Sequence, residues 1–200
     1  DGTDARERIE AAIVMGEVTT AKDLGFFATP QPLARQLVEL ADIQPGHMVL
    51  EPSAGEGAIV EAILDREAVC FAIECDKTRR EKLFKRYGAH PTFVLGPGED
   101  FMTYDTIEPF DAVVMNPPFM KCGLGDHLDH VRHAFSMLVP GGMLVSVMPS
   151  GVQFRNDRRH REFREWIIGD GGAIQDLPEG SFKASDTGVN TCVIRMRKGL

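Results

Sequence analysis

Short apolar runs alternate along this chain with longer amphipathic or charged segments, and this alternation limits the possible fold more than any other feature. The run 110–115 is an example: it is short, contains Val113 and Val114, and carries no charge after Asp111. Such a run is typical of a strand buried in a parallel sheet. Strands that alternate with helices predict an α/β domain with a doubly wound, mostly parallel sheet of seven strands. The expected strands are 48–51, 69–74, 92–95, 112–115, 143–148, 173–177 and 191–196, and the expected helices are 3–18, 30–41, 58–66, 78–87, 126–138 and 158–168.

Composition places the chain among ordinary globular proteins. With 200 residues, 43% of them hydrophobic and 26% charged, we expect a single domain over 1–200. No apolar stretch approaches the roughly 18–20 residues that span a bilayer, and the start of the chain is polar, unlike a signal peptide. The cysteines form no Cys-x-x-Cys pair, which argues against a disulfide framework or zinc site. These features predict a cytoplasmic protein without membrane contact.

The tetrapeptide Asn116-Pro117-Pro118-Phe119 directly follows the run 110–115. Prolines lack a backbone N–H and end a strand, so Asn116 is expected at the carboxyl edge of the sheet, where open α/β folds bind ligands. An Asn side chain offers one acceptor and two donors. Phe119 adds a flat apolar face, so the pair suits a planar substrate with an amino group. The alternative is an ordinary turn, because Asn-Pro often begins one.

A glycine-rich segment, 51–57, lies between the first expected strand and its helix. Gly55 and Gly57 allow the backbone to turn tightly and approach a ligand closely. The segment is not Gly-x-Gly-x-x-Gly, and it lacks the Lys of a phosphate-binding loop. Glu51 is unsuited to a pyrophosphate but suits a cationic amino group. S-adenosylmethionine, with its ammonium and sulfonium, meets this requirement.

Acidic residues also follow the next two strands. Glu74 can accept hydrogen bonds from both hydroxyls of a ribose, which implies a ribose without a 2′-phosphate. Asp100 can accept a hydrogen bond from an adenine amino group, with Phe101 against the ring. Each acid alone has a simpler interpretation as the cap of the following helix. Their joint order and spacing favour a nucleoside site.

With these motifs in this order, the sequence resembles the amino-methyltransferases that use S-adenosylmethionine. The resemblance is strongest to the N6-adenine DNA methyltransferases of gamma-type motif order, in which the cofactor motif precedes Asn-Pro-Pro-aromatic. It implies a Rossmann-like class I methyltransferase domain, with S-adenosylmethionine as cofactor and a role in restriction-modification. The segment 1–45, with its Phe-x-Thr-Pro element, would close over the cofactor. The residues implied to bind the cofactor are Phe27, Thr29, Glu51, Ser53, Gly55, Gly57, Glu74, Cys75, Asp100, Phe101 and Asn116.

The same resemblance implies the chemistry. The exocyclic amine of adenine is a poor nucleophile because its lone pair is delocalised into the ring. Hydrogen bonds to the Asn116 side-chain carbonyl and the Pro117 backbone carbonyl would draw this nitrogen toward sp³ geometry and position it for transfer. Phe119 and Phe182 would hold the target base, which must be flipped out of a duplex.

Several substrates remain open. Asn-Pro-Pro-aromatic also occurs in enzymes that methylate RNA adenine, RNA guanine or the side-chain amide of glutamine in proteins. A non-catalytic subunit that only binds the cofactor is a further alternative. DNA methyltransferases of this order usually add a target-recognition domain, and no separate one is expected within 1–200. Such a domain was removed, is supplied by a partner subunit, or is not needed.

Two charged clusters complete the candidates. The net charge of −8 means that nucleic acid, DNA before RNA, must be contacted through a local basic patch or a partner. Arg155, Arg158 and Arg159 lead the one basic concentration, which is either a phosphate contact or a solvated helix face. The segment 126–133 has three histidines at helical spacing. For it we expect a partly packed solvated face and no metal.

Overall fold

The computed structural model describes residues 28–119, 125–178, 181 and 190–200. The expected helix at 3–18, most of the segment 1–45, and the predicted site residues Phe27 and Phe182 lie outside these ranges. Cys122 lies outside them as well.

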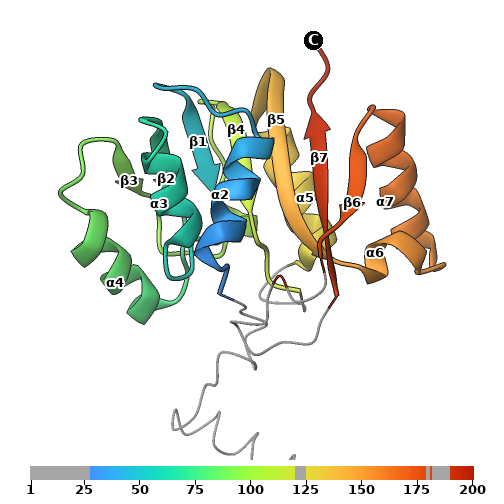
Figure 1. The fold of residues 1–200 in the computed structure, drawn as a ribbon, viewed down its shortest axis with the longest axis horizontal. Coiled ribbons are helices and arrows are strands. Elements are labelled where there is room, and N and C mark those ends of the chain that lie inside the picture. Colours follow the sequence, from blue (N-terminus) through green and yellow to red (C-terminus); the bar gives the residue numbers. More distant parts are fainter. Residues whose placement is uncertain (1–27, 120–124, 179–180, 182–189) are drawn as a thin grey trace, which may run out of the picture.

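Seven strands form one sheet in the order β3-β2-β1-β4-β5-β7-β6, which confirms the predicted α/β architecture. Strands β1 to β5 are parallel, whereas β7 runs antiparallel to both β5 and β6. The order reverses between β1 and β4, and open α/β sheets bind ligands at such a point. Figure 1 shows the parallel strands ending at the lower edge of the sheet. The strands are β1 Met48–Glu51, β2 Val69–Ala72, β3 Phe93–Leu95, β4 Phe110–Met115, β5 Leu138–Pro149, β6 Ala173–Asp176 and β7 Thr191–Arg197.

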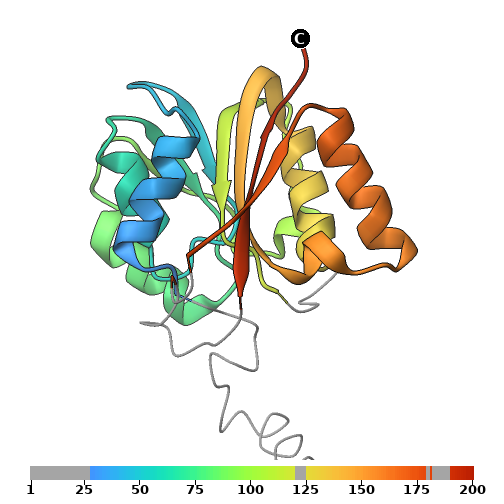
Figure 2. The ribbon, with the colours of Figure 1, turned by 45° about the vertical axis from the view of Figure 1, so that its right-hand side comes forward.

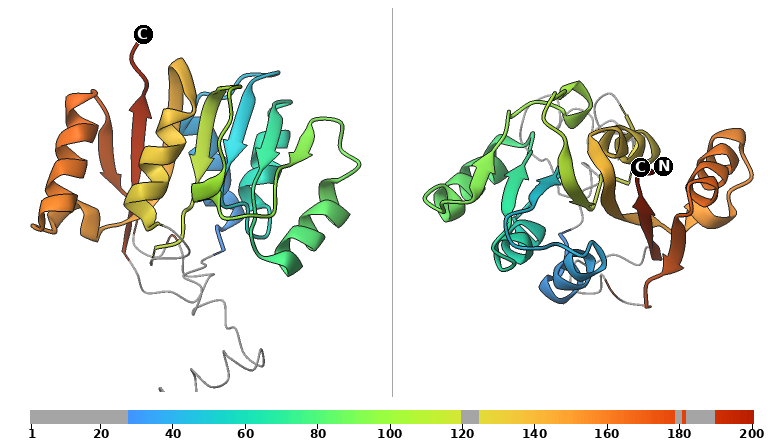
Figure 3. Two further views of the ribbon diagram at one scale, coloured as in Figure 1. Left: turned by 180° about the vertical axis from the view of Figure 1, so that it is seen from behind. Right: turned by 90° about the horizontal axis from the view of Figure 1, so that it is seen from above.

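Helices cover both faces of the sheet, as Figures 2 and 3 show. Alternate residues of β1 point to opposite faces, so Val49 joins the core under α2, α3 and α4, and Leu50 joins the core under α5 and α7. Both side chains are fully buried. The helical elements are α2 Gln31–Leu40, α3 Ala58–Leu64, α4 Lys77–Tyr87, η1 Phe101–Thr103, α5 His127–Ser136, α6 Gly151–Phe154 and α7 Arg158–Gly169.

The longest strand begins earlier than expected. The sequence predicts a helix up to 138 and a strand from 143, but β5 already begins at Leu138. Gly141 has a φ of 81°, and its N–H donates to the Lys198 carbonyl. The pairing of β4 with β5 also shifts register between Phe110 and Ala112. Pairing with the segment after β7 therefore keeps this glycine-containing stretch in the sheet.

Two helix starts show which side chains are used as caps. Thr29 is predicted as the N-cap of the helix at 30–41, but Pro30 holds that position and makes no side-chain cap. At α4 the cap is Asp76, whose carboxylate accepts a hydrogen bond from the Arg79 N–H at 2.8 Å. Neither Thr29 nor Glu74 is therefore the N-cap of the helix that follows it, and their side chains make other contacts.

Candidate functional site

Four predicted polar residues gather at the carboxyl ends of neighbouring strands. Glu51 is the last residue of β1, and Asn116 follows β4 directly. These strands pair through Val49 with Ala112 and Leu50 with Val113. Glu74 and Asp100 follow β2 and β3 along the same edge. The topology thus brings together residues that are far apart in the sequence.

A cavity of about 360 Å³ opens at this edge. Among the predicted residues, it is lined by Thr29, Ser53, Gly55 and Asn116. The other predicted cofactor-binding residues within the described ranges do not line it: Glu51, Gly57, Glu74, Cys75, Asp100 and Phe101. Its remaining walls contain residues that the sequence analysis missed: Ala28, Gln31, Ala54, Glu56, Ala58, Ile59, Glu61 and Arg86.

Glu51 is fully buried under this cavity's glycine loop. Its Oε1 accepts a hydrogen bond from the Ser53 N–H at 3.0 Å, whereas its Oε2 is buried without a hydrogen-bond partner among the described residues. Burial raises the pKa of the Glu51 carboxyl well above its usual range; the Ser53 N–H opposes this effect and the nearby Glu74 adds to it. A buried carboxyl oxygen without a donor is costly. This acceptor and the similarly unpartnered Ser53 Oγ fit a ligand that carries an ammonium group.

Glu74 is also buried, but protein donors surround its carboxylate. Its Oε2 accepts from the Gly55 N–H at 2.8 Å. Its Oε1 accepts from the Asp76 N–H at 2.8 Å and from Arg79 Nη2 at 3.2 Å. The Cys75 thiol lies 3.9 Å from the same oxygen. Glu74 therefore ties the glycine loop to the end of β2.

The glycine loop is held by Tyr87, a residue that no sequence motif singled out. Gly57 has a φ of 89°, and a Cβ there would lie 2.8 Å from Tyr87 Cε2 and 2.9 Å from Leu83 Cδ2. The Tyr87 hydroxyl donates a hydrogen bond to the Gly57 carbonyl at 3.2 Å. Burial is the main reason that the pKa of Tyr87 rises to about 12, so the hydroxyl remains a donor at neutral pH. Both the backbone angle and the space require glycine at position 57.

Asn116 forms a hydrogen bond with the Phe-x-Thr-Pro element. Its Nδ2 donates a hydrogen bond to Thr29 Oγ1 at 3.0 Å across 87 residues of sequence. Because the amide nitrogen faces Thr29, the side-chain group that Asn116 can present to an amine is its carbonyl. The following Pro117 is buried, and Phe119 is half-buried against the core. The two motifs that the sequence analysis selected separately thus meet in one contact.

Asp100 and Phe101 serve local structure. The Asp100 carboxylate accepts a hydrogen bond from the Met102 N–H at 2.9 Å and caps η1. Phe101 is only 3% exposed, and its ring lies 4.8 Å from that of His133 and 5.7 Å from that of His130. Their contact with an adenine ring therefore stays a prediction.

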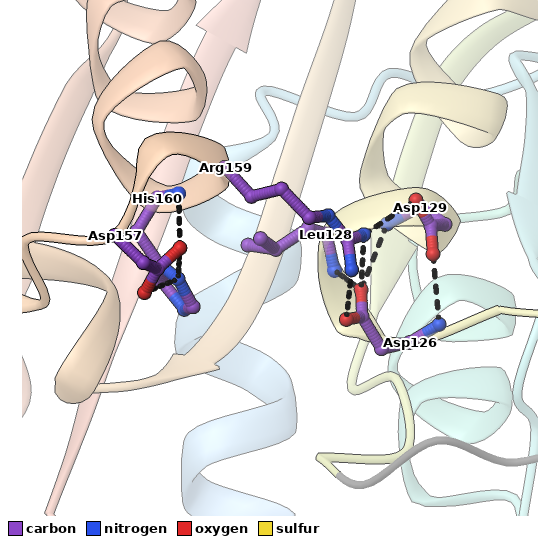
Figure 4. Close-up of polar contacts among 6 residues, drawn as sticks. All are labelled: Asp126, Leu128, Asp129, Asp157, Arg159 and His160. Carbon is purple, nitrogen blue, oxygen red and sulfur yellow. Dashed lines mark hydrogen bonds and ion pairs between the residues drawn. The ribbon is translucent and has the colours of Figure 1, made fainter.

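Most arginines of the basic segment bind groups of the protein itself. Arg159 reaches from α7 to α5, where it donates to Asp126 at 3.0 Å and to Asp129 at 2.8 Å, as Figure 4 shows. Arg158 pairs with Glu162 at 2.7 Å. Both arginine side chains are nevertheless more than half exposed, at 84% for Arg158 and 57% for Arg159, so their phosphate contact stays a prediction.

Two of the three histidines of α5 are buried, although the sequence predicts a partly packed solvated face; His133 is half-buried. His127 and His130 are 6% and 5% exposed because α5 packs on the sheet and against η1. Burial lowers the pKa of both, an effect that neighbouring carboxylates oppose. Within the described ranges, no three or more His, Cys, Asp or Glu side chains are arranged to hold a metal ion. In the same ranges, no helix has the length and apolar character needed to cross a bilayer.

No protein-family model matches this chain. Several curated proteins resemble parts of it. A probable ribosomal RNA small subunit methyltransferase A of Methanospirillum hungatei is 33% identical over 101 residues, which cover 49% of this chain and 38% of that protein. The type II methyltransferase M.CvrRI of Paramecium bursaria Chlorella virus XZ-6E is 28% identical over 148 residues, which cover 65% of this chain and 37% of that protein. The chain thus spans less than two fifths of the length of these relatives.

Solved structures share the whole architecture. The M protein of the type I restriction enzyme EcoKI superposes with a TM-score of 0.67 at 23% identity, covering 88% of this chain and 44% of that one. A Listeria monocytogenes protein assigned to the class I S-adenosylmethionine-dependent methyltransferases gives 0.68 at 15% identity, covering 96% and 66%. The 23S rRNA methyltransferase ErmE gives 0.62 at 21% identity, covering 86% and 69%. The fold of this chain is therefore that of the class I S-adenosylmethionine-dependent methyltransferases.

Proposed function

We propose that this chain transfers a methyl group from S-adenosylmethionine to the exocyclic N6 amine of adenine in DNA. The observation that carries the proposal is the bond from Asn116 Nδ2 to Thr29 Oγ1 beside the cavity at the β1/β4 edge. It joins the Phe-x-Thr-Pro element and the Asn-Pro-Pro-Phe motif in one place. The similarity to a type II methyltransferase and to a type I modification protein supports DNA as the substrate.

S-adenosylmethionine is the cofactor expected from these relatives, and the residues at the cavity fit it. When bound, it supplies an electrophilic methyl group on a sulfonium. The buried Glu51 Oε2 would accept a hydrogen bond from its ammonium group, and the backbone of Gly55 and Gly57 allows its close approach. Glu74 would bind the ribose by exchanging some of its present protein donors for hydroxyls. Asp100 would bind the adenine amine, with Phe101 near the ring, and Cys75 lies beside Glu74.

The remaining residues orient the acceptor. Thr29 holds the amide nitrogen of Asn116, so the Asn116 carbonyl faces the substrate amine, which also donates to the Pro117 carbonyl. Pro118 and Phe119 would border the acceptor amine. Phe119 would stack on the target base, with Phe182 as a second aromatic. The amine forms the new N–C bond as the S–C bond breaks, and its proton then passes to water. Positioning supplies most of the rate because no general base is required before attack.

An RNA substrate is the second candidate. It is favoured by the similarity to a ribosomal RNA small subunit methyltransferase A and to a 23S rRNA methyltransferase. In RNA the planar amine of adenine or guanine would meet the same acceptors. Because the chain spans less than two fifths of its curated relatives, we propose that a further domain or a partner subunit supplies target recognition.

The test is a transfer assay with labelled cofactor against duplex DNA, single-stranded DNA, structured RNA and a protein with accessible glutamines. We expect label in the N6 position of DNA adenine. The matched variant is Asn116→Ala, which should abolish transfer and retain cofactor binding. Label in RNA or protein alone would replace the DNA proposal, and substantial turnover by Asn116→Ala would overturn the assigned mechanism.

A further inference from the structure

One exposed aromatic side chain at the same edge of the sheet has no part in the site described above. Phe154 ends the short helix α6, which follows β5 directly. Its side chain is 68% exposed, whereas Val152 of the same helix is fully buried. Figure 1 shows α6 at the lower edge, where the parallel strands end. Phe154 therefore faces solvent on the side where a substrate must approach Asn116.

A groove of about 450 Å³ lies beside this ring. It combines an apolar surface with amide, hydroxyl and carboxylate groups. Gln153 Nε2 donates a hydrogen bond to Asp176 Oδ1, which joins α6 to β6 and orders one rim. The lining residues are Ser150, Gln153, Phe154, Asp176, Leu177 and Asn190, together with Thr191. Such a mixture suits a planar heterocycle that stacks on one side and forms hydrogen bonds at its edge.

Arg155, next to this ring, differs from the other arginines of the basic segment. Arg158 and Arg159 form ion pairs with acids of the protein, and Arg164 donates to the carbonyls of Val152 and Arg155 at 2.8 Å. The Arg155 side chain is exposed, and its guanidinium forms no ion pair within the part of the chain that the structure describes. Arg164 thus fixes the backbone of a residue whose charge is available to a ligand.

We propose that Phe154, Arg155 and the adjoining groove form a second nucleic-acid subsite, which takes an unpaired base near the target nucleotide. The base stacks on Phe154, and Arg155 contacts a phosphate of the same strand. The inference rests on the proposed function in one respect, namely that the substrate is a nucleic acid. The groove adjoins β7, two strands from β4 through β5, so it lies on the order of 10 Å from the Asn116 edge at the usual strand spacing. It is therefore separate from the pocket for the methylated base.

The chain offers a matched control for the ring. Phe84 on α4 is 65% exposed, close to the 68% of Phe154, but it lies at the other end of the sheet, near β3. Loss of a stacking side chain from a nucleic-acid site weakens binding by about tenfold. We expect Phe154→Ala to bind a labelled single-stranded oligonucleotide about tenfold more weakly, as measured by fluorescence polarisation. Phe84→Ala should bind like the wild type.

Further variants separate stacking on the ring from nonspecific hydrophobic binding. Phe154→Trp should restore affinity because it keeps a flat ring, and Phe154→Leu should not. Arg155→Gln should reduce the slope of log affinity against log salt concentration by about 1, the value for one phosphate contact. DNA and RNA oligonucleotides of one sequence, run in parallel, distinguish the two sources of the base.

The outcomes are distinct. If the wild type binds oligonucleotide and Phe154→Ala binds equally well, the second subsite is wrong and the proposed function stands. If Phe84→Ala weakens binding as much as Phe154→Ala, the subsite is also wrong. If the wild type binds neither DNA nor RNA while it methylates a protein, the nucleic-acid substrate fails together with the subsite.

Discussion

In two regions of this molecule, burial shifts the pKa values of titratable side chains in opposite directions. At the carboxyl edge of the sheet, Glu51 is fully buried and the pKa of its carboxyl is raised. On α5, His127 and His130 are almost fully buried and the pKa of each imidazole is lowered. Burial favours the neutral form in both regions. The regions differ in their surroundings. Glu51 precedes the loop that lines the cavity, whereas the histidines pack among aromatic rings and charged partners.

Burial of a titratable group therefore does not by itself mark a functional site. His127 faces Asp126, His160, Arg155 and the backbone of Phe119. His130 faces Asp100, Asp126, Asp129 and His133. Opposing carboxylates are therefore already present on α5 and η1. The charged group that contributes to the pKa of Glu51 is another carboxylate, Glu74, which raises it further. In the proposed function, a cationic ligand supplies the partner of this carboxyl.

The largest effects are expected from Glu51→Gln, which removes the charge of the buried carboxylate at the sheet edge. Removing one member of a buried charge pair costs about 2 kcal/mol or more of binding, so cofactor affinity should fall at least about 30-fold. The same change should raise the free energy of unfolding at pH 8. The reason is that a carboxyl with a raised folded pKa loses stability as pH increases above its unfolded pKa of about 4.5.

Calorimetry with S-adenosylmethionine and chemical denaturation measure these two effects. Glu74→Gln is the matched comparison, because its carboxylate accepts from Gly55, Asp76 and Arg79. It should lower the free energy of unfolding. A stability change of the same sign in both variants would contradict the distinction between the two carboxyls.

Thr29→Val tests how Asn116 is positioned. The change keeps the shape of the side chain and removes the oxygen that accepts from Asn116 Nδ2. Turnover should fall about tenfold, which corresponds to about 1.4 kcal/mol in the transition state. Thr29→Ser keeps the hydroxyl and should recover most of the rate. Equal losses in Thr29→Val and Thr29→Ser would show that packing, rather than the hydroxyl, is responsible.

The pH dependence of stability tests the histidine region. A histidine with a lowered folded pKa contributes stability that is complete above its unfolded pKa of about 6.5 and is lost as pH falls below it. The free energy of unfolding should therefore fall between pH 7 and pH 5, by on the order of 1 kcal/mol. In the double variant His127→Gln and His130→Gln, this slope should flatten. His90→Gln, at an exposed position, should leave it unchanged.

The smallest expected effect is that of Arg159→Ala. The arginine side chain is 57% exposed, so its pairs with Asp126 and Asp129 should contribute less than about 1 kcal/mol. Denaturation in low and high salt measures this loss, which should shrink as salt increases. Oligonucleotide affinity should stay close to that of the wild type. A loss as large as that of Arg155→Gln would mean that Arg159 also contacts phosphate.

Much of the fold follows from local pattern. The alternation of apolar runs and helices predicted a seven-stranded, mostly parallel sheet, because period and length decide which segments can be buried strands. The two prolines after β4 fixed where that strand ends. Since parallel strands end at one edge, the sequence also predicted that Glu51, Glu74, Asp100 and Asn116 would share it. The resemblance to amino-methyltransferases gave these positions their proposed roles.

The partners of these side chains required the tertiary structure. Thr29 looked like a helix cap and instead binds Asn116. Glu51 and Glu74 have the same side chain and the same kind of position, yet one has an oxygen without a partner among the described residues and the other is surrounded by donors. Tyr87 gave no sequence signal at all. Sequence determined the strands and the edge because those depend on neighbouring residues. Packing across distant segments decided which donors reach each side chain, and hence which of them remain available for a ligand.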